Sequence, residues 1–327
     1  MERLSCGRAL ASVIAVAASA LLSGLVAAQE NYPDHPVRII VPFSPSGGTD
    51  IQARALAQSF LESTGQSFVV ENRPGASGLI GAQYVVDSPP DGYTILFSTA
   101  TLAVNTTLYG QRMKFSAVRD LAPVSWITST PLVLVVHPSV PAKTVPELVA
   151  LEKKRPGVLT AGVNTIGSTS HLSAEMLKQF AGVAHIIVPY KGGGPALIGL
   201  MSGETDYLFA TAPSAMPHIR SGKVRAIAVT TEKKASAFPD LPTMSQFYPG
   251  FTADNWYGMF VRSGTPQPII AKINTEILKA LKTPTVIKFM ADEGLDPVGS
   301  TPAELAALLR REIAKYGKTI EVAGIKL

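Results

Sequence analysis

The chain has 327 residues, a net charge of +5 and a single cysteine, and 46% of its residues are hydrophobic. A chain of this length can bury a large core and usually forms two domains or one large one. One cysteine excludes a disulfide scaffold and a multi-cysteine metal site. The normal apolar fraction and modest, mixed charge exclude a disordered chain.

Residues 1–28 have the pattern of a secretory signal peptide. Arg3 and Arg8 precede an uncharged apolar stretch over residues 9–28, which ends in small residues at the expected cleavage site. A retained membrane anchor is the alternative, because a stretch of about 20 uncharged residues can just span a bilayer. Cleavage after residue 28 removes Cys6, so we expect a cysteine-free mature protein.

After this segment, short β-branched or apolar runs alternate with amphipathic segments. Expected strands cover residues 37–41, 68–70, 94–97, 126–137, 159–163, 186–189, 207–210 and 226–229. Expected helices cover residues 49–63, 78–86, 168–180, 195–202 and 214–220, and two more begin at the capping boxes of Thr144 and Thr301. The alternation predicts an α/β protein with mostly parallel sheets. The pattern restarts after the long apolar stretch 126–137, which predicts two similar units.

Four clusters rich in Gly, Ser and Thr each follow an expected strand and precede an expected helix. They lie at residues 42–50, 71–78, 164–171 and 189–195. In open α/β sheets the carboxyl ends of strands line the ligand crevice, and helix N-termini there offer free N–H groups. Any one cluster fits an ordinary turn and helix cap. Four at equivalent places predict a site for a carboxylate.

Standard catalytic and cofactor motifs do not occur. No Gly-x-Gly-x-x-Gly opens a helix, no Gly-x-Ser-x-Gly elbow is found, and the five histidines form no close pair. Lys and Arg form no run, so nucleic acid is not expected as a partner. We therefore expect no cofactor, no metal and no enzymatic activity.

Several individual side chains have two readings. Asp50 and Asp206 are interpreted as structural residues that tie down loop amides. His171, in the first turn of an expected helix, is either a donor in the pocket or a helix-packing residue. Trp256 and Tyr257 are interpreted as hinge or core residues rather than as ligand platforms.

Further motifs stand in a characteristic order along the chain. The strongest are Glu71-Asn72-Arg73-Pro74-Gly75-Ala76, Pro90-Asp91-Gly92-Tyr93, residues 167–171, Val188-Pro189-Tyr190-Lys191-Gly192 and Trp256-Tyr257-Gly258. In this order they resemble the receptors of tripartite tricarboxylate transporters, the Bug-type periplasmic solute-binding proteins. The resemblance covers essentially the whole mature chain. It implies an α/β, type II periplasmic-binding-protein fold, in which two α/β domains close on a ligand cleft between them.

The resemblance also implies the domain limits and the site. Domain 1 would comprise residues 29–130 and 256–327, and domain 2 residues 131–255. Backbone amides, hydroxyls and bridging waters would hold a ligand carboxylate. The residues expected to bind the ligand are Phe43, Pro45, Ser46, Gly47, Gly48, Ala76, Ser77, Gly78, Ser98, Thr99, Thr101, Thr165, Ser168, Thr169, His171, Tyr190, Gly192, Gly193 and Asp206.

Two loops depart from the usual pattern of that family. The first loop usually has Gly-Gly where this chain has Ser46-Gly47, and the second usually has Gly-Gly-Asn where this chain has Ser77-Gly78-Leu79. Both departures reshape the expected pocket, so the ligand of any one relative does not transfer to this chain.

The resulting expectation is a non-enzymatic, monomeric periplasmic receptor. It would capture a di- or tricarboxylate, an acidic amino acid or an aromatic carboxylate and deliver it to a membrane permease of two integral subunits. One alternative is a periplasmic sensor that reports the ligand to a signalling partner. A second alternative is a secreted serine hydrolase that uses Ser168 and His171, an arrangement recognised by geometry.

Overall fold

The computed structural model describes residues 32–235 and 237–323, and the expected signal peptide lies outside them. Its strands follow the order β2-β1-β3-β9-β4-β7-β5-β6, and β8 and β10 also pair with β4. The strand bounds are β1 Val37–Val41, β2 Phe68–Asn72, β3 Thr94–Thr99, β4 Leu121–Val136, β5 Thr160–Val163, β6 Ile186–Pro189, β7 Tyr207–Thr211, β8 Arg225–Val229, β9 Asp254–Arg262 and β10 Asp296–Pro297. The predicted α/β class is confirmed.

Helices cover both faces of this sheet. Their bounds are α2 Gly48–Thr64, α3 Leu79–Val86, α4 Thr101–Leu108, α5 Val145–Lys154, α6 Thr169–Ala181, α7 Gly193–Met201, α8 Ala212–Arg220, α9 Met244–Phe247, α10 Gln267–Ala280, α11 Pro284–Glu293 and α12 Pro302–Ala323. Thr144 and Thr301 each accept the amide of the glutamate three residues later at 3.3 Å, so both predicted helix starts are confirmed. The capping box is reciprocal at Thr301, whose amide donates to Glu304, whereas Glu147 accepts the amide of Lys143 instead. Among the described helices, none is long and apolar enough to cross a bilayer.

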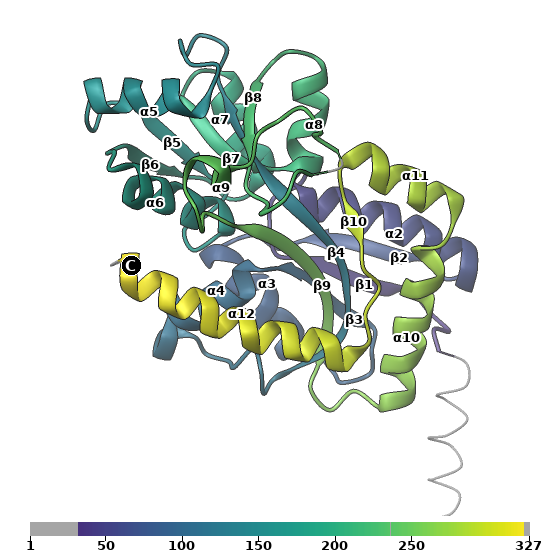
Figure 1. Cartoon of the computed structure of the whole chain (residues 1–327). Coiled ribbons are helices and arrows are strands. Elements are labelled where there is room, and N and C mark those ends of the chain that lie inside the picture. The colour runs from purple at the N-terminus through teal and green to yellow at the C-terminus, as the bar shows by residue number, and fades with distance from the viewer. Residues whose placement is uncertain (1–31, 236, 324–327) are drawn as a thin grey trace, which may run out of the picture.

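Strand β4 is shared by two lobes (Figure 1). It pairs with β9 as far as Pro131 and with β7 and β8 from Leu132 to Val136. The first lobe contains β1–β3 and β10 with α2–α4 and α10–α12, and the second contains β5–β8 with α5–α9. The expected domain limits fall within β4 and β9, and their exact positions stay a prediction.

The expectation of mostly parallel sheets is wrong at the centre of the molecule. Parallel pairs form between β1 and its neighbours β2 and β3 and between β5 and its neighbours β6 and β7. Strand β4, however, runs antiparallel to β7, β8, β9 and β10. The chain passes from the first lobe to the second along β4 and returns along β9, so these two strands must run in opposite directions.

Alternate residues of each strand face opposite layers of helices. In β1, Ile39 packs with the cluster that includes residues of α2 and α10, and Ile40 packs with the cluster that includes residues of α3, α4 and α12. In the second lobe, the neighbouring residues Leu134 and Val135 of β4 likewise pack into two different clusters, one on each face of the sheet. Burial on both faces explains why these strands are apolar throughout.

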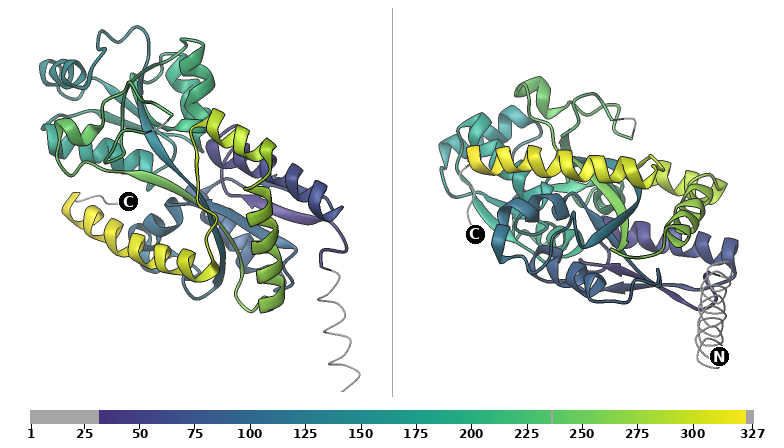
Figure 2. Two further views of the ribbon diagram at one scale, coloured as in Figure 1. Left: turned by 45° about the vertical axis from the view of Figure 1, so that its right-hand side comes forward. Right: turned by 90° about the horizontal axis from the view of Figure 1, so that it is seen from below.

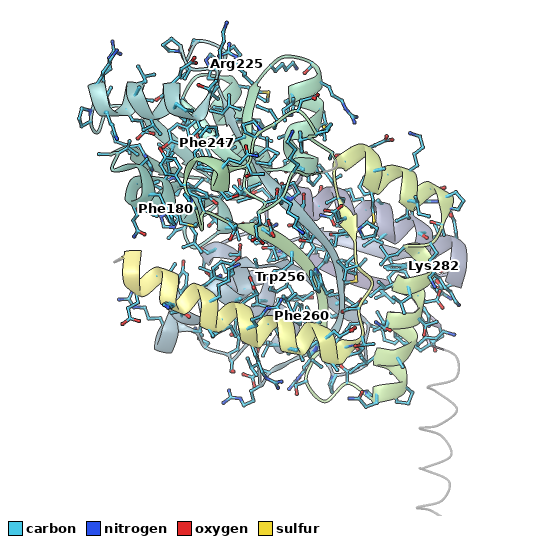
Figure 3. The ribbon with its side chains drawn as sticks, viewed as in Figure 1. Phe180, Arg225, Phe247, Trp256, Phe260 and Lys282 are labelled. Carbon is cyan, nitrogen blue, oxygen red and sulfur yellow. The ribbon has the colours of Figure 1, made fainter. Side chains whose placement is uncertain are left out.

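Helix α12 returns the end of the chain to the first lobe, where it lies along β4 and α4 (Figure 2). Leu305 and Leu308 pack there with Trp256 and Phe260 (Figure 3). The sequence predicted this apolar helix face, and the structure shows that it packs mainly on the first lobe and also contacts α6 of the second.

A buried polar pair lies inside the second lobe. Glu152 Oε2 and His185 Nδ1 are 3.1 Å apart, and both side chains are fully buried. The Tyr207 hydroxyl lies 2.7 Å from the same nitrogen. Removing one partner would leave buried polar groups unsatisfied, which is costly.

We therefore expect Glu152→Ala to lower the free energy of unfolding by about 3 kcal/mol. Chemical denaturation at pH 7 measures this change. The control is Lys288→Ala, which removes an exposed ion pair with Asp292 and should cost at most about 0.5 kcal/mol. Equal stabilities for the two variants would contradict the assigned role of Glu152.

Candidate ligand-binding site

A polar cavity lies between the lobes at the carboxyl ends of the parallel strands. Its empty volume is about 390 Å³, part of which opens to solvent. Helices α2, α4, α6 and α7 all begin there, since their first residues, Gly48, Thr101, Thr169 and Gly193, line the cavity. Helix N-termini present unpaired N–H groups and a partial positive charge, so this arrangement favours an anion.

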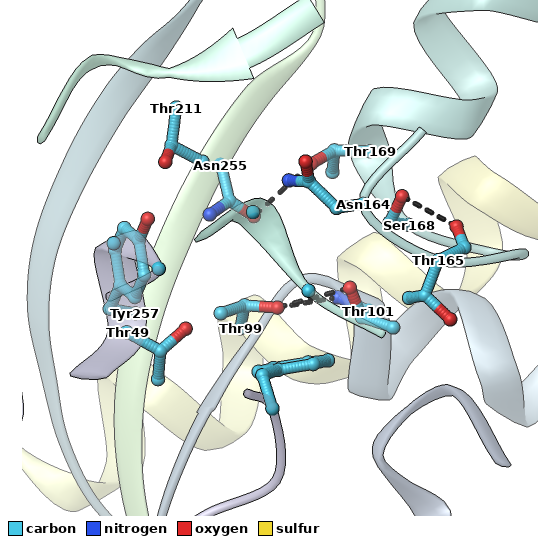
Figure 4. A pocket seen from close by; sticks show the side chains of 15 residues that line it. Thr49, Thr99, Thr101, Asn164, Thr165, Ser168, Thr169, Thr211, Asn255 and Tyr257 are labelled. Atoms are coloured by element: carbon cyan, nitrogen blue, oxygen red, sulfur yellow. Dashed lines mark hydrogen bonds between the residues drawn. The ribbon is translucent and has the colours of Figure 1, made fainter. Parts of the chain in front are cut away.

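The cavity wall is polar but carries no charged side chain. It consists of backbone and of hydroxyl, amide and aromatic side chains from both lobes (Figure 4). The lining residues are Phe43, Gly47, Gly48, Thr49, Thr99, Thr101, Asn164, Thr165, Ser168, Thr169, Gly192, Gly193, Thr211, Asn255 and Tyr257. An anion here would therefore be bound by neutral donors rather than by a lysine or arginine.

Glycines let the loops approach one another closely. A Cβ atom at position 48 would lie 2.6 Å from the Tyr257 hydroxyl oxygen and 2.7 Å from Thr211 Oγ1, so only glycine fits. A Cβ atom at position 194 would lie 2.6 Å from the Pro45 carbonyl oxygen, across the lobes. The contact at Gly48 limits the room in the cavity, and the contact at Gly194 lets the two lobes approach closely.

Asp50 holds the loop between β1 and α2. Its Oδ2 accepts the Ser46 amide at 3.0 Å, and Oδ1 accepts from Asn72 at 3.0 Å and from Arg54 at 2.9 Å. Burial tends to raise the pKa of Asp50, but the hydrogen bonds from Arg54, Ser46 and Asn72 outweigh it and lower the pKa. The interpretation of Asp50 as a loop anchor is confirmed.

Tyr257 was expected to be a hinge or core residue, and it also forms part of the cavity wall. Its side chain is fully buried, and the polar side chains of Thr211, Asn255 and Gln52 interact with its hydroxyl. Burial raises the pKa of Tyr257 to about 12, so the phenol keeps its proton. The Asn164 side-chain oxygen in the wall finds no partner among the described residues. The Asn164 oxygen is therefore free to bind a ligand or water.

Ser168 and His171 do not form a nucleophile–base pair. The Ser168 hydroxyl caps α6 by accepting the His171 amide at 3.2 Å, and it donates to the Thr165 carbonyl at 2.7 Å. The imidazole Nδ1 instead accepts the Gly167 amide at 3.2 Å. Burial lowers the pKa of His171, which favours the neutral form of the ring. His171 supports the loop and is not in the cavity wall.

The structure brings ten of the nineteen expected residues to the cavity wall and adds five others. The ten are Phe43, Gly47, Gly48, Thr99, Thr101, Thr165, Ser168, Thr169, Gly192 and Gly193, and the five additions are Thr49, Asn164, Thr211, Asn255 and Tyr257. The remaining nine are outside the wall: Pro45, Ser46, Ala76, Ser77, Gly78, Ser98, His171, Tyr190 and Asp206.

Asp206 and Tyr190 lie away from the cavity for different reasons. Asp206 directly precedes β7, at the end of the strand opposite the cavity, where its Oδ2 accepts the Thr160 amide at 2.7 Å. The Tyr190 ring turns toward α7, so that its hydroxyl oxygen would lie only 2.0 Å from a Cβ atom at Gly199. Asp206 therefore holds the starts of β5 and β7 together. This agrees with its interpretation as a structural residue.

Comparisons with known proteins agree on one family. A family model described as "Tripartite tricarboxylate transporter family receptor" matches residues 52–325. Protein BugT of Bordetella pertussis is 37% identical over 301 residues, which cover 91% of this chain and 92% of BugT.

Two similar solved structures contain a ligand. A protein of R. palustris, solved with adipate, is 34% identical with a TM-score of 0.88, and the match covers 90% of this chain and 99% of that one. MatC from Rhodopseudomonas palustris, solved with bound malate, is 30% identical with a TM-score of 0.83, covering 88% of this chain and all of MatC. The type II periplasmic-binding-protein fold predicted from the sequence is confirmed.

The loop anchor makes a testable prediction about pH. Folding lowers the pKa of the Asp50 carboxyl below its ordinary value. The ionised group therefore stabilises the folded protein at pH values above the ordinary pKa. This stabilisation is lost as the pH falls through the pKa of the folded state. We expect Asp50→Asn to lower the free energy of unfolding by about 2 kcal/mol at pH 7. The difference from wild type should shrink below about pH 4.

Urea denaturation from pH 3 to pH 8 measures this effect. Asp292→Asn is the matched control, because Asp292 lies in an exposed pair with Lys288. A difference for Asp50→Asn that stays constant over this pH range would contradict the role of its charge.

Proposed function

The chain belongs to the tripartite tricarboxylate transporter receptor family, and from this membership we propose that it is a periplasmic receptor for a small dicarboxylate. The observation that carries the proposal is the uncharged cavity where four helix N-termini meet. The leader pattern of residues 1–28 supports export to the periplasm.

One ligand carboxylate would occupy the helix ends. The backbone near Gly47, Gly48 and Gly193 supplies N–H groups, and Thr49 and Thr101 supply hydroxyls. Fixed dipoles in a water-poor site bind a charge more strongly than the same groups do in water. Because these donors are already oriented by the fold, little reorganisation is needed when the ligand arrives.

Two relatives support a dicarboxylate as the ligand class. Adipate and malate, which two relatives bind in their structures, each carry two carboxylates. An acidic amino acid would also place an ammonium group in a cavity whose wall has no acidic side chain. The partly open cavity gives the second carboxylate access to water.

Capture would couple to closure of the two lobes. Both lobes contribute to the cavity wall, and the Ser44 amide donates to the Lys191 carbonyl across them at 3.1 Å. A ligand that contacts both lobes shifts the population toward the closed form. We propose that this form, with domains divided at residues 130/131 and 255/256, acts as a monomer and delivers its ligand to a two-subunit membrane permease without chemical change.

Calorimetric titration with malate, adipate, citrate, glutamate and benzoate tests the proposal. We expect a dicarboxylate to bind most tightly and to raise the melting temperature, since a ligand at 100 times its Kd adds about 2.7 kcal/mol of stability. If none of the five compounds bound or raised the melting temperature, the proposed function would be wrong.

A substitution at Gly48 tests where in the cavity the ligand binds. In Gly48→Ala the new methyl group would collide with Tyr257 and Thr211, and we expect the affinity for the best ligand of that panel to fall at least about tenfold, or 1.4 kcal/mol. The matched variant is Gly47→Ala, whose Cβ atom comes no closer than 3.4 Å to its neighbours and should cost less. Equal affinities for the two variants, both folded by circular dichroism, would refute this placement of the ligand.

A further inference from the structure

Ser77 adopts a backbone conformation that favours glycine. It has φ 56° and ψ 33° in the short turn before α3, and the preceding Ala76 has φ 45°. Residues with a Cβ atom are strained in this left-handed region, whereas glycine adopts it readily. The Ser77 side chain therefore stands at a position where the backbone disfavours any Cβ atom.

The Ser77 hydroxyl joins the two lobes. It accepts a hydrogen bond from Thr165 Oγ1 of the second lobe at 3.1 Å, and it lies 2.9 Å from the Tyr109 hydroxyl of the first lobe. The Ser77 carbonyl is held in place by Asn105 Nδ2 at 2.8 Å. Tyr109, Ser77 and Thr165 thus form a hydrogen-bonded bridge that requires the lobes to be together.

The bridge is formed by side chains, and one of its residues, Thr165, lines the cavity. The Ser44–Lys191 contact joins two backbones, so any residue pair can form it. The bridge through Ser77 instead needs a hydroxyl at position 77, and glycine there would leave Thr165 without that acceptor. Thr165 lines the cavity, so the bridge also fixes the direction of one cavity side chain.

We propose that Ser77 is a latch residue that stabilises the closed receptor and prolongs the residence of its ligand. The inference rests on the proposed function, because it assigns a role in closure around a dicarboxylate. Ser77 acts through Thr165 and is a positioning residue, since it is not part of the cavity wall. A glycine at position 77 supports the same loop but supplies no latch.

The test compares Ser77→Gly, Ser77→Ala and Tyr109→Phe with wild type in stopped-flow binding of malate and of adipate. One net hydrogen bond corresponds to roughly a three- to tenfold change in an equilibrium constant. We expect the dissociation rate of Ser77→Gly to rise by that factor while the association rate changes less than twofold. Tyr109→Phe should raise the dissociation rate by a smaller factor, because Thr165 keeps its hydrogen bond to Ser77.

Melting temperatures of the ligand-free variants separate the latch from a general loss of structure. Glycine relieves the left-handed strain, so Ser77→Gly should melt no lower than wild type and above Ser77→Ala. Tyr248→Phe, which removes a phenol hydroxyl beside Phe180 in the second lobe, is the matched control and should leave both rates unchanged. A Ser77→Gly dissociation rate equal to that of wild type would overturn the proposal.

The latch can also be tested in the ligand-free protein. If neither malate nor adipate raises the melting temperature of wild type, the choice of ligand in the proposed function has failed. Small-angle X-ray scattering of the ligand-free proteins then decides. A larger radius of gyration for Ser77→Gly than for wild type supports the latch, and equal radii overturn it.

Discussion

The cavity depends on one strand that belongs to both lobes. Strand β4 is paired with β9 up to Pro131 and with β7 and β8 beyond it, so backbone hydrogen bonds fix how the lobes face each other. The ladder changes partners beside the cavity, where Asn255 and Tyr257 of β9 form part of the wall. Loops from either lobe therefore meet at a place that the sheet has already set, and the helices that follow those loops direct their N-termini into it.

The proposed anion site contains no cationic side chain among its described residues. A buried carboxylate–arginine pair needs near-perfect geometry to repay the loss of water around both ions. Neutral N–H and O–H groups lose less on burial, and the fold has already oriented them. Selectivity among anions must then come from the shape of the cavity. The close contact at Gly48 and the close approach of the lobes at Gly194 constrain that shape. The same weak individual contacts let a receptor release its ligand, which a transport protein requires.

The sequence predicted the parts of the site that come from loops and missed the parts that come from strands. Glycine and hydroxyl residues placed after β-branched runs were a sufficient signal for Gly48 and Thr101, because the local pattern alone puts them at a helix start. Thr211 and Tyr257 were missed because their position depends on which strands pair, and β9 was not recognised as a strand. Register is a long-range property, so a single sequence does not reveal it. Asp206 shows the opposite error: its motif is distinctive, but it lies at the far end of the strand.

The uncharged cavity wall has a consequence for net charge. No lysine, arginine or histidine is among the described residues that line it, so no such side chain balances the charge of a bound anion there. The negative charge of the proposed ligand would therefore be added to that of the protein. A loaded molecule is then less basic than an empty one, a difference that any partner with a charged surface can sense at a distance.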